Sequence, residues 1–227
     1  MITLAIGNKA YSSWSLRPWI LLSECGIPFS EDFIPLDTPE FKTRVAAYGA
    51  GKTVPILKHG DIVVWESLAI IDYLAELFPD RGIWPSDPAA RAFARAISAE
   101  MHAGFGALRR ACPMNIRKAF ARKDRGADVQ ADVARIEHLW GEARRRFGAD
   151  GRFLFGAFSA ADAMYAPVVT RLQTYSVAVN ETTRAYMDAV LNTSSFQIWH
   201  QAAMAEPFTL KHDEIDEAAV GPFPLPR

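Results

Sequence analysis

The order of apolar patterns along the first 80 residues restricts the fold more than any other feature of the chain. Residues 2–6 form a short apolar segment typical of a buried strand, and residues 13–24 show helical apolar spacing that ends before Gly26. Residues 28–36 then alternate as a second strand does. Because a helix connects the two strands, we expect them to be parallel, with a right-handed crossover.

Two more strands and a helix follow in this part of the chain. Residues 54–58 and 61–65 are short apolar segments, and His59-Gly60 between them is a candidate two-residue hairpin turn. Glu66 and Ser67 then open a strong helical stripe. The stripe contains Leu68, Ile71, Leu74 and Ala75. The sequence therefore predicts a β-α-β unit followed by a β-β-α unit, which is an α/β arrangement closed by an antiparallel hairpin.

The composition changes after this segment. Residues 78–88 contain three Pro and one Gly, a composition typical of a linker. We place a first domain at 1–80, a linker at 81–88 and a second domain at 89–227. The second domain is expected to be all-α, since no further strand pattern appears before the tail.

Helical spacing dominates the second domain. The expected helices are 93–112, ending before Pro113, then 128–147, one starting after Ser159, 182–191 and 195–205. Ser159 and Asp162 have the spacing of a capping box, with Asp in place of the usual Glu. Residues 206–227 carry four Pro and are expected to form a tail packed over the surface.

Charge and cysteine content narrow the possible functions. The net charge of −1, from 25 basic and 26 acidic residues, gives no basic face for nucleic acid. The two cysteines, Cys25 and Cys112, are far apart, and no metal-ligand spacing is present, so we expect no metal. No apolar run approaches the roughly 18 residues that cross a membrane. Without a basic N-terminal start or a cleavage site, the chain is predicted to be a soluble cytoplasmic protein.

The junction between the first strand and the first helix carries two hydroxyls, Ser12 and Ser13. A helix cap needs only one of them. Nucleophilic catalysis is poorly supported, because the surrounding "AYSSW" lacks the glycines of a nucleophile elbow. A third possibility is that the helix N-terminus and one hydroxyl stabilise an anion.

A thiolate is an anion that such a junction could stabilise. A charge-assisted hydrogen bond contributes roughly 1.5–3 kcal/mol, and one pKa unit corresponds to about 1.4 kcal/mol. One serine could therefore lower the pKa of a bound thiol from about 8.5 toward 7. Since no cysteine of the chain lies at this position, the thiol would have to arrive on a ligand.

Two further motifs fit a peptide-like ligand. In "TVP", Thr53–Pro55, a cis proline would leave the backbone of Val54 free to pair with an extended peptide; a plain edge strand is the alternative. In "WES", Glu66 and Ser67 could hold both ends of an amino-acid zwitterion, or simply cap the next helix.

The segments "SSWSLRPWILL", "KTVPIL", "WESLAIIDYLAELFP" and "FSAADAMYAPVV" together resemble the soluble glutathione transferases. The resemblance extends from residue 2 to about residue 205. It implies a thioredoxin-like N-terminal domain, an all-helical C-terminal domain, glutathione as co-substrate and a homodimer.

The same resemblance implies roles for single residues. "SSW" is similar to the "SSC" of zeta-like members, which indicates that Ser12 activates the thiol, with Ser13 beside it as the second catalytic candidate. One of the two hydroxyls is expected to cap the helix, which would be Ser13 if Ser12 is the donor; Tyr11 is an alternative donor. Trp14 stands where those members carry cysteine, which argues against cysteine-dependent chemistry. The glutathione-binding candidates are Lys52, Thr53, Val54, Pro55, Glu66 and Ser67.

The second substrate is expected between the domains, beside the first helix of the second domain. The candidates for this pocket are Trp14, Phe105, Arg109 and Cys112, with core packing as the alternative for Phe105 and Cys112. The predicted function is transfer of glutathione to a small hydrophobic or acidic electrophile. The alternatives are glutathione-dependent cis–trans isomerisation of a maleyl-type diacid and a non-catalytic glutathione-binding protein.

Overall fold

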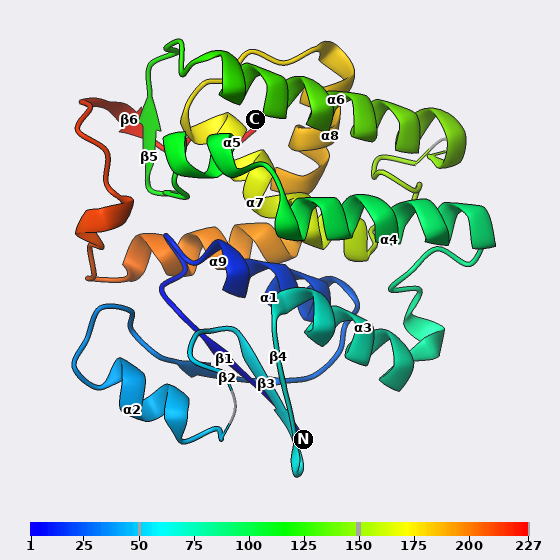
Figure 1. Ribbon diagram of the computed structural model, residues 1–227, viewed down its shortest axis with the longest axis vertical. Helices are drawn as coiled ribbons and strands as arrows, with labels where there is room; N and C mark the ends of the chain where they lie inside the picture. The colour runs from blue at the N-terminus through cyan, green and yellow to red at the C-terminus, as the bar shows by residue number, and fades with distance from the viewer. Residues whose placement is uncertain (50, 149–150, 227) are drawn as a thin grey trace.

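The computed structural model describes residues 1–49, 51–148 and 151–226, in which a small α/β half lies below a larger helical half (Figure 1). The sheet has the order β2-β1-β3-β4. Its strands are β1 (Ile2–Ile6), β2 (Ser30–Phe33), β3 (Ile56–His59) and β4 (Ile62–Trp65). β1 and β2 are parallel, and β3 is antiparallel to both β1 and β4. The predicted parallel pairing of the first two strands and the predicted antiparallel hairpin are therefore confirmed.

The turn of the β3–β4 hairpin differs from the prediction by one residue. His59 pairs with Ile62, so the two turn residues are Gly60 and Asp61, not His59 and Gly60. Gly60 has φ +62°, a conformation that glycine adopts without steric cost. Strand β3 therefore continues to His59, one residue beyond the apolar segment 54–58 from which the strand was predicted.

Three helices complete the α/β half: α1 (Ser13–Glu24), α2 (Phe41–Ala46) and α3 (Ser67–Leu77). Helix α2 closes one small core, in which Val45 packs with Ala5, Ile34, Val54 and Ile56. Helix α1 belongs to the main core, and it packs against α3 and also against α7 (Ala160–Thr174), which belongs to the helical half. One continuous apolar core thus joins the two halves and fixes the position of the α1 N-terminus.

The helical half contains α4 (Pro88–Ala103), α5 (Gly106–Ala111), α6 (Ala127–Phe147), α7 (Ala160–Thr174), α8 (Glu181–Leu191) and α9 (Ser194–Ala205), with short 3₁₀ turns η1 (Pro79–Arg81) and η2 (Lys211–Asp213). The predicted single helix over residues 93–112 is wrong. The chain breaks at Gly104 and at Phe105, whose φ of +57° is left-handed. The sequence does not reveal this break, because Met101, Phe105 and Leu108 keep helical apolar spacing across it and all lie in the same core.

The predicted capping box at the start of α7 is confirmed. The Asp162 carboxylate accepts hydrogen bonds from the Ser159 backbone N–H and the Ser159 hydroxyl, both at 2.8 Å. It also accepts from the Leu154 N–H at 3.1 Å. Helix α7 is buried over almost its whole length, so this cap positions the central helix of the molecule. The helix expected over residues 128–147 is α6, which begins one residue earlier, at Ala127, with Gly126 as its N-cap.

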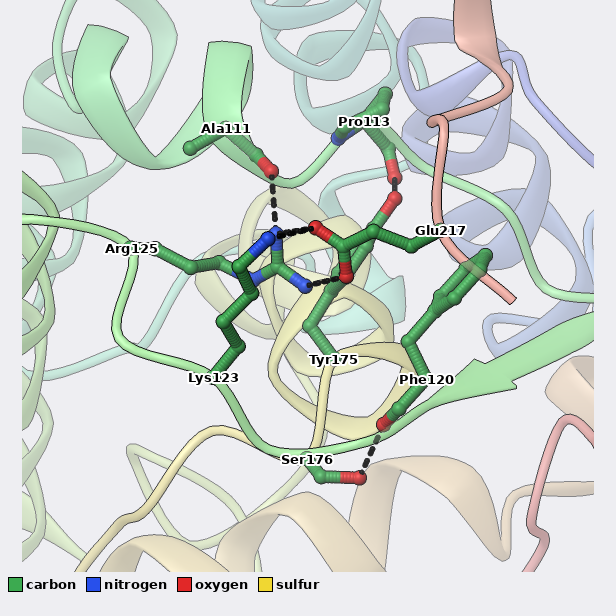
Figure 2. Close-up of polar contacts among 8 residues, drawn as sticks. All are labelled: Ala111, Pro113, Phe120, Lys123, Arg125, Tyr175, Ser176 and Glu217. Carbon is green, nitrogen blue, oxygen red and sulfur yellow. Dashed lines mark hydrogen bonds and ion pairs between the residues drawn. The ribbon is translucent and has the colours of Figure 1, made fainter. Parts of the chain in front are cut away.

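The C-terminal tail is attached to the helical half more firmly than its composition indicates. Strands β5 (Lys118–Phe120) and β6 (Ala219–Pro222) pair antiparallel, and β5 is too short to give a pattern in the sequence. Figure 2 shows the Arg125 guanidinium between the Glu217 carboxylate and the Ala111 carbonyl. Arg125 also lies over the Tyr175 ring, 4.5 Å from its centroid. Within the described residues, no helix is long and apolar enough to cross a membrane.

Candidate functional site

A cavity of about 600 Å³ lies where the two halves and the tail meet. Its first wall belongs to the α/β half and includes Tyr11, Ser12, Ser13, Trp14, Thr53 and Val54. Its second wall belongs to the helical half and includes Gly106, Arg109, Arg110, Pro113, Met114 and Arg171. His212 and Asp213 of the tail close one side. Segments far apart in the sequence thus meet at the N-terminus of α1.

The two serines at this N-terminus have different environments. Ser12 is the N-cap of α1, and its Oγ accepts from the Ser15 N–H at 3.4 Å. This corrects the expected division of roles: Ser13 is already the first helical residue, so the cap is Ser12. The Ser12 and Ser15 hydroxyls are hydrogen-bonded at 2.8 Å, and the Gly7 N–H donates to Ser15 Oγ at 3.1 Å. The Ser13 hydroxyl makes no hydrogen bond to another described residue.

Tyr11, the alternative thiol activator, already has a partner. Its hydroxyl donates to Glu214 of the tail at 2.8 Å. Burial, together with the hydrogen bond and charge of Glu214, raises the pKa of Tyr11 to about 12. A phenol with such a pKa stays neutral at physiological pH, and its proton points at a carboxylate of the chain.

The Val54–Pro55 peptide bond is cis, as expected for the "TVP" motif. Val54 is buried and lines the cavity, yet it precedes β3 and takes no part in the sheet. No hydrogen bond to another described residue occupies its backbone N–H or C=O. Because buried peptide groups are almost always paired, this one is available to a ligand.

Glu66 and Ser67 lie at the N-terminus of α3. Glu66 has φ +67° and ψ 122°, a strained backbone for a residue with a Cβ. Its carboxylate makes no capping hydrogen bond, is 58% exposed, and lies 3.6 Å from His102 Nε2. Burial, and the positive charge of Arg17 beside it, lower the pKa of His102, so this contact is weak at neutral pH. Ser67 is buried and accepts from Arg17 Nη1 at 3.4 Å.

Trp14 lies against two guanidinium groups. Arg17 is 4.2 Å and Arg109 is 4.6 Å from the centroid of its ring, and His102 packs edge-on at 5.3 Å. Arg17 is 1% exposed, and its Nε has no hydrogen-bond partner in the described part of the chain. Trp14 therefore makes cation–π contacts with both guanidinium groups at the N-terminal end of α1.

Six of the sequence-based candidates are not among the residues that line the cavity. They are Lys52, Pro55, Glu66, Ser67, Phe105 and Cys112. Phe105 and Cys112 are buried in the main core, which is the alternative that their spacing allowed. Burial raises the pKa of Cys112 to about 11, so its thiol is unreactive at neutral pH. Lys52 is exposed, and Pro55, the residue after Val54, is buried.

Sequence patterns did not point to three residues of the cavity lining, Arg171, His212 and Asp213. Arg171 is 5% exposed on the second wall and lies in α7, within the apolar segment "APVVTRL". A lone arginine in a segment of that kind is a usable signal, because a buried charge requires compensation. The tail residues His212 and Asp213 carry no comparable signal, since nothing in a polar, proline-containing segment shows where it folds back. In the described ranges, no cluster of three or more His, Cys, Asp or Glu side chains is arranged to hold a metal.

The fold and the cavity define a class: a thioredoxin-like α/β half joined to a helical half, with a helix N-terminus facing the space between them. Residues 11–77 match the model of the glutathione S-transferase N-terminal domain, and residues 119–189 match that of the glutathione S-transferase C-terminal domain. Together these ranges cover more than half of the chain. The chain belongs to the glutathione S-transferase family.

Individual relatives share either low sequence identity with this chain or only a short aligned region. Protein IN2-1 homolog A of Oryza sativa subsp. japonica is 28% identical over 169 residues, 73% of this chain and 63% of that protein. Glutathione S-transferase 1 of Dianthus caryophyllus is 50% identical over 87 residues, 36% of this chain and 37% of that protein. The chain thus spans less than two thirds of these relatives. A crystal structure of a glutathione transferase homologue from Burkholderia, with bound glutathione, has a TM-score of 0.67 at 24% identity, over 90% of this chain and 99% of that one.

Proposed function

We propose that the protein binds glutathione in this cavity and joins the glutathione sulfur to a small electrophile. The observation that carries this proposal is the N-terminus of α1, where two serines face the cavity beside the unpaired peptide group of Val54. A peptide can pair with Val54 by strand addition while its thiol meets the helix N-terminus. Membership of the glutathione S-transferase family supports glutathione as that peptide.

Glutathione would lie along the first wall. The cysteinyl part pairs with the backbone of Val54, which Thr53 and Pro55 hold at the cavity edge. Glu66 and Ser67 bind the amine and the carboxylate of the γ-glutamyl end; the uncapped, exposed carboxylate of Glu66 supports this role. Lys52, exposed and close in sequence, meets the glycine carboxylate.

Ser12 donates to the bound thiolate in this proposal. A hydroxyl proton rotates freely, so Ser12 can turn its O–H toward sulfur and accept from the hydroxyl and the N–H of Ser15 instead. The Gly7 N–H, which donates to Ser15, extends this chain of hydrogen bonds, and successive bonds polarise one another. Ser13, whose hydroxyl has no partner among the described residues, is a second donor at the same end of the helix.

The reaction needs no general base. The thiol proton leaves to solvent, and the thiolate sulfur forms the new C–S bond. On a halo-aromatic ring, the halide then departs with the bonding electron pair. On an activated alkene, the C=C electron pair shifts toward the activating group, and a solvent proton completes the adduct.

The assembly and location follow the same proposal. We propose a cytoplasmic homodimer that binds neither nucleic acid nor membrane. The exposed edge strand β4 supports the dimer, since Ile62 and Trp65 are 50% and 47% exposed there. Large apolar side chains on an unpaired edge strand are typical of a surface that another chain covers.

Calorimetric titration with glutathione, followed by conjugation assays with 1-chloro-2,4-dinitrobenzene, tests the function. We expect saturable binding and turnover, both weakened in Ser12→Ala. Isomerisation of a maleyl diacid without conjugation would instead support the isomerase alternative. Binding with no turnover of either compound would support a glutathione-binding protein without catalysis, and absence of binding would refute the proposal.

A further inference from the structure

Four arginines surround the cavity without an acidic partner. Arg109, Arg110 and Arg171 line it, and Arg17 is buried beside Trp14. Across the described ranges, no carboxylate oxygen lies within 4.0 Å of a nitrogen of any of the four. Arg17 and Arg171 are buried, Arg109 is half-buried and Arg110 is exposed. Charged groups are rarely buried unless paired, so Arg171 in the cavity wall favours an anion that the chain does not supply.

Arg171 is the most deeply placed of the three that reach the cavity. Its Nε donates to the Cys112 carbonyl at 3.0 Å and its Nη1 to the Pro167 carbonyl at 3.2 Å. These contacts hold the guanidinium in place and leave further N–H groups of its five for a ligand. Burial, and then the charge of Arg109, lower the pKa of Arg171 to about 10, so it remains charged at neutral pH.

One carboxylate of the chain does approach this wall. Asp213 lines the cavity, and its charge interacts with that of Arg171 without forming an ion pair. Asp213 pairs instead with His212 at 3.3 Å, and His212 pairs with Asp37 of the α/β half at 2.9 Å. A carboxylate is therefore the kind of group that this side of the cavity admits, and the outer nitrogens of Arg171 stay free for a second one.

We propose that the second substrate is a carboxylic acid, whose carboxylate binds Arg171 and Arg109 on the helical wall. This inference rests on the proposed function, because it names the substrate class of the same site. Glutathione would occupy the opposite wall, at Ser12 and Val54, so the two carboxylates of glutathione do not account for these arginines. Pro113 and Met114, on the same wall, contact the apolar body of the acid.

Equilibrium binding tests the inference without needing turnover. The protein is saturated with S-methylglutathione, which fills the glutathione wall and cannot react, and is then titrated calorimetrically with 3-nitrobenzoate or with the neutral 3-nitrobenzamide. We expect the benzoate to bind at least tenfold more tightly than the amide, as expected for a charge-assisted bidentate contact. Equal affinities, or competition between 3-nitrobenzoate and S-methylglutathione, would overturn the inference.

Substitutions localise the effect. Arg171→Met should reduce the preference for benzoate at least tenfold, and Arg109→Met, at a half-buried position, provides the same test if Arg171→Met does not fold. Arg122→Met is the matched control, since it removes an exposed positive charge that does not line the cavity and should leave the preference for benzoate unchanged. Asp213→Asn should increase the preference for benzoate, because the tail carboxylate no longer repels the ligand. An unchanged preference in both Arg171→Met and Arg109→Met would overturn the inference.

Turnover separates this inference from the proposed function. With glutathione as co-substrate, we expect the ratio of kcat/KM for 4-chloro-3-nitrobenzoate to that for its methyl ester to fall in Arg171→Met and Arg109→Met. Turnover of both compounds with a ratio unaffected by either variant would overturn the acid preference and leave the transferase intact. Tight binding of 3-nitrobenzoate with no turnover of either compound would refute the transferase and support the anion site.

Discussion

Glu214 attaches the tail to the site, and its removal should release the segment that carries His212 and Asp213. The Glu214 carboxylate accepts from the Tyr11 hydroxyl at 2.8 Å, the Asn115 amide at 3.0 Å and the Lys118 ammonium at 2.6 Å. In Glu214→Ala the buried Tyr11 hydroxyl loses its acceptor, which costs about 1–3 kcal/mol. Lys118 is 44% exposed, so its ion pair adds little.

The free energy of tail opening should therefore fall by about 2 kcal/mol. Hydrogen exchange measures this opening directly, and 2 kcal/mol corresponds to roughly 30-fold faster exchange. The Asp213 amide, which donates to the Leu210 carbonyl, is a suitable reporter. Asp216→Ala is the control, since Asp216 is an exposed carboxylate with no hydrogen bond to the described residues. Exchange in Glu214→Ala no faster than in Asp216→Ala would show that Glu214 does not hold the tail against the site.

Three further predictions concern pH, the alternative donor and the fold. Burial opposes ionisation of Glu214, but hydrogen bonds from Lys118 and Tyr11 outweigh this effect and lower its pKa. The tail contact should thus be fully stable above about pH 4.3, the pKa of an unperturbed Glu, and should weaken as the pH falls through the lower pKa of the folded state. Hydrogen exchange of the tail amides, measured against pH, tests this prediction. Tyr11→Phe should leave the pKa of a bound glutathione thiol unchanged, because the Tyr11 proton is held by Glu214; a raised thiol pKa would make Tyr11 the donor. Asp162→Ala should lower the free energy of unfolding by about 2–4 kcal/mol, against about 1 kcal/mol for the exposed cap in Asn180→Ala, as measured by urea denaturation. Equal losses in these two variants would contradict the role given to the buried box.

Local sequence patterns predicted the strands and helices of the α/β half, which carries the first wall of the cavity. The β-α-β and β-β-α order follows from periods of 2 and 3.6, and the Ser159/Asp162 spacing predicted the cap of α7. The break between α4 and α5 was missed because Phe105 keeps helical apolar spacing while its backbone turns left-handed.

The second wall depends on contacts that no local pattern describes. Arg171 reaches the cavity only because α7 packs on α1 and α4, and the tail reaches it through Glu214 and the β5–β6 pair. The role of Ser12 as a cap depends on its φ of −78° and ψ of 85°, which the adjacent identical residue Ser13 does not share. Two neighbouring serines cannot be told apart by residue type alone.

The pKa of the bound glutathione thiol tests the central claim most directly. It is measured by titrating the ultraviolet absorbance of the thiolate in the wild type and in Ser12→Ala, Ser12→Thr and Ser13→Ala. We expect a pKa of about 7 in the wild type, a rise of about one to two units in Ser12→Ala, and retention of the low value in Ser12→Thr, which keeps the hydroxyl. An unchanged pKa in Ser12→Ala, with a raised one in Ser13→Ala, would contradict the central claim.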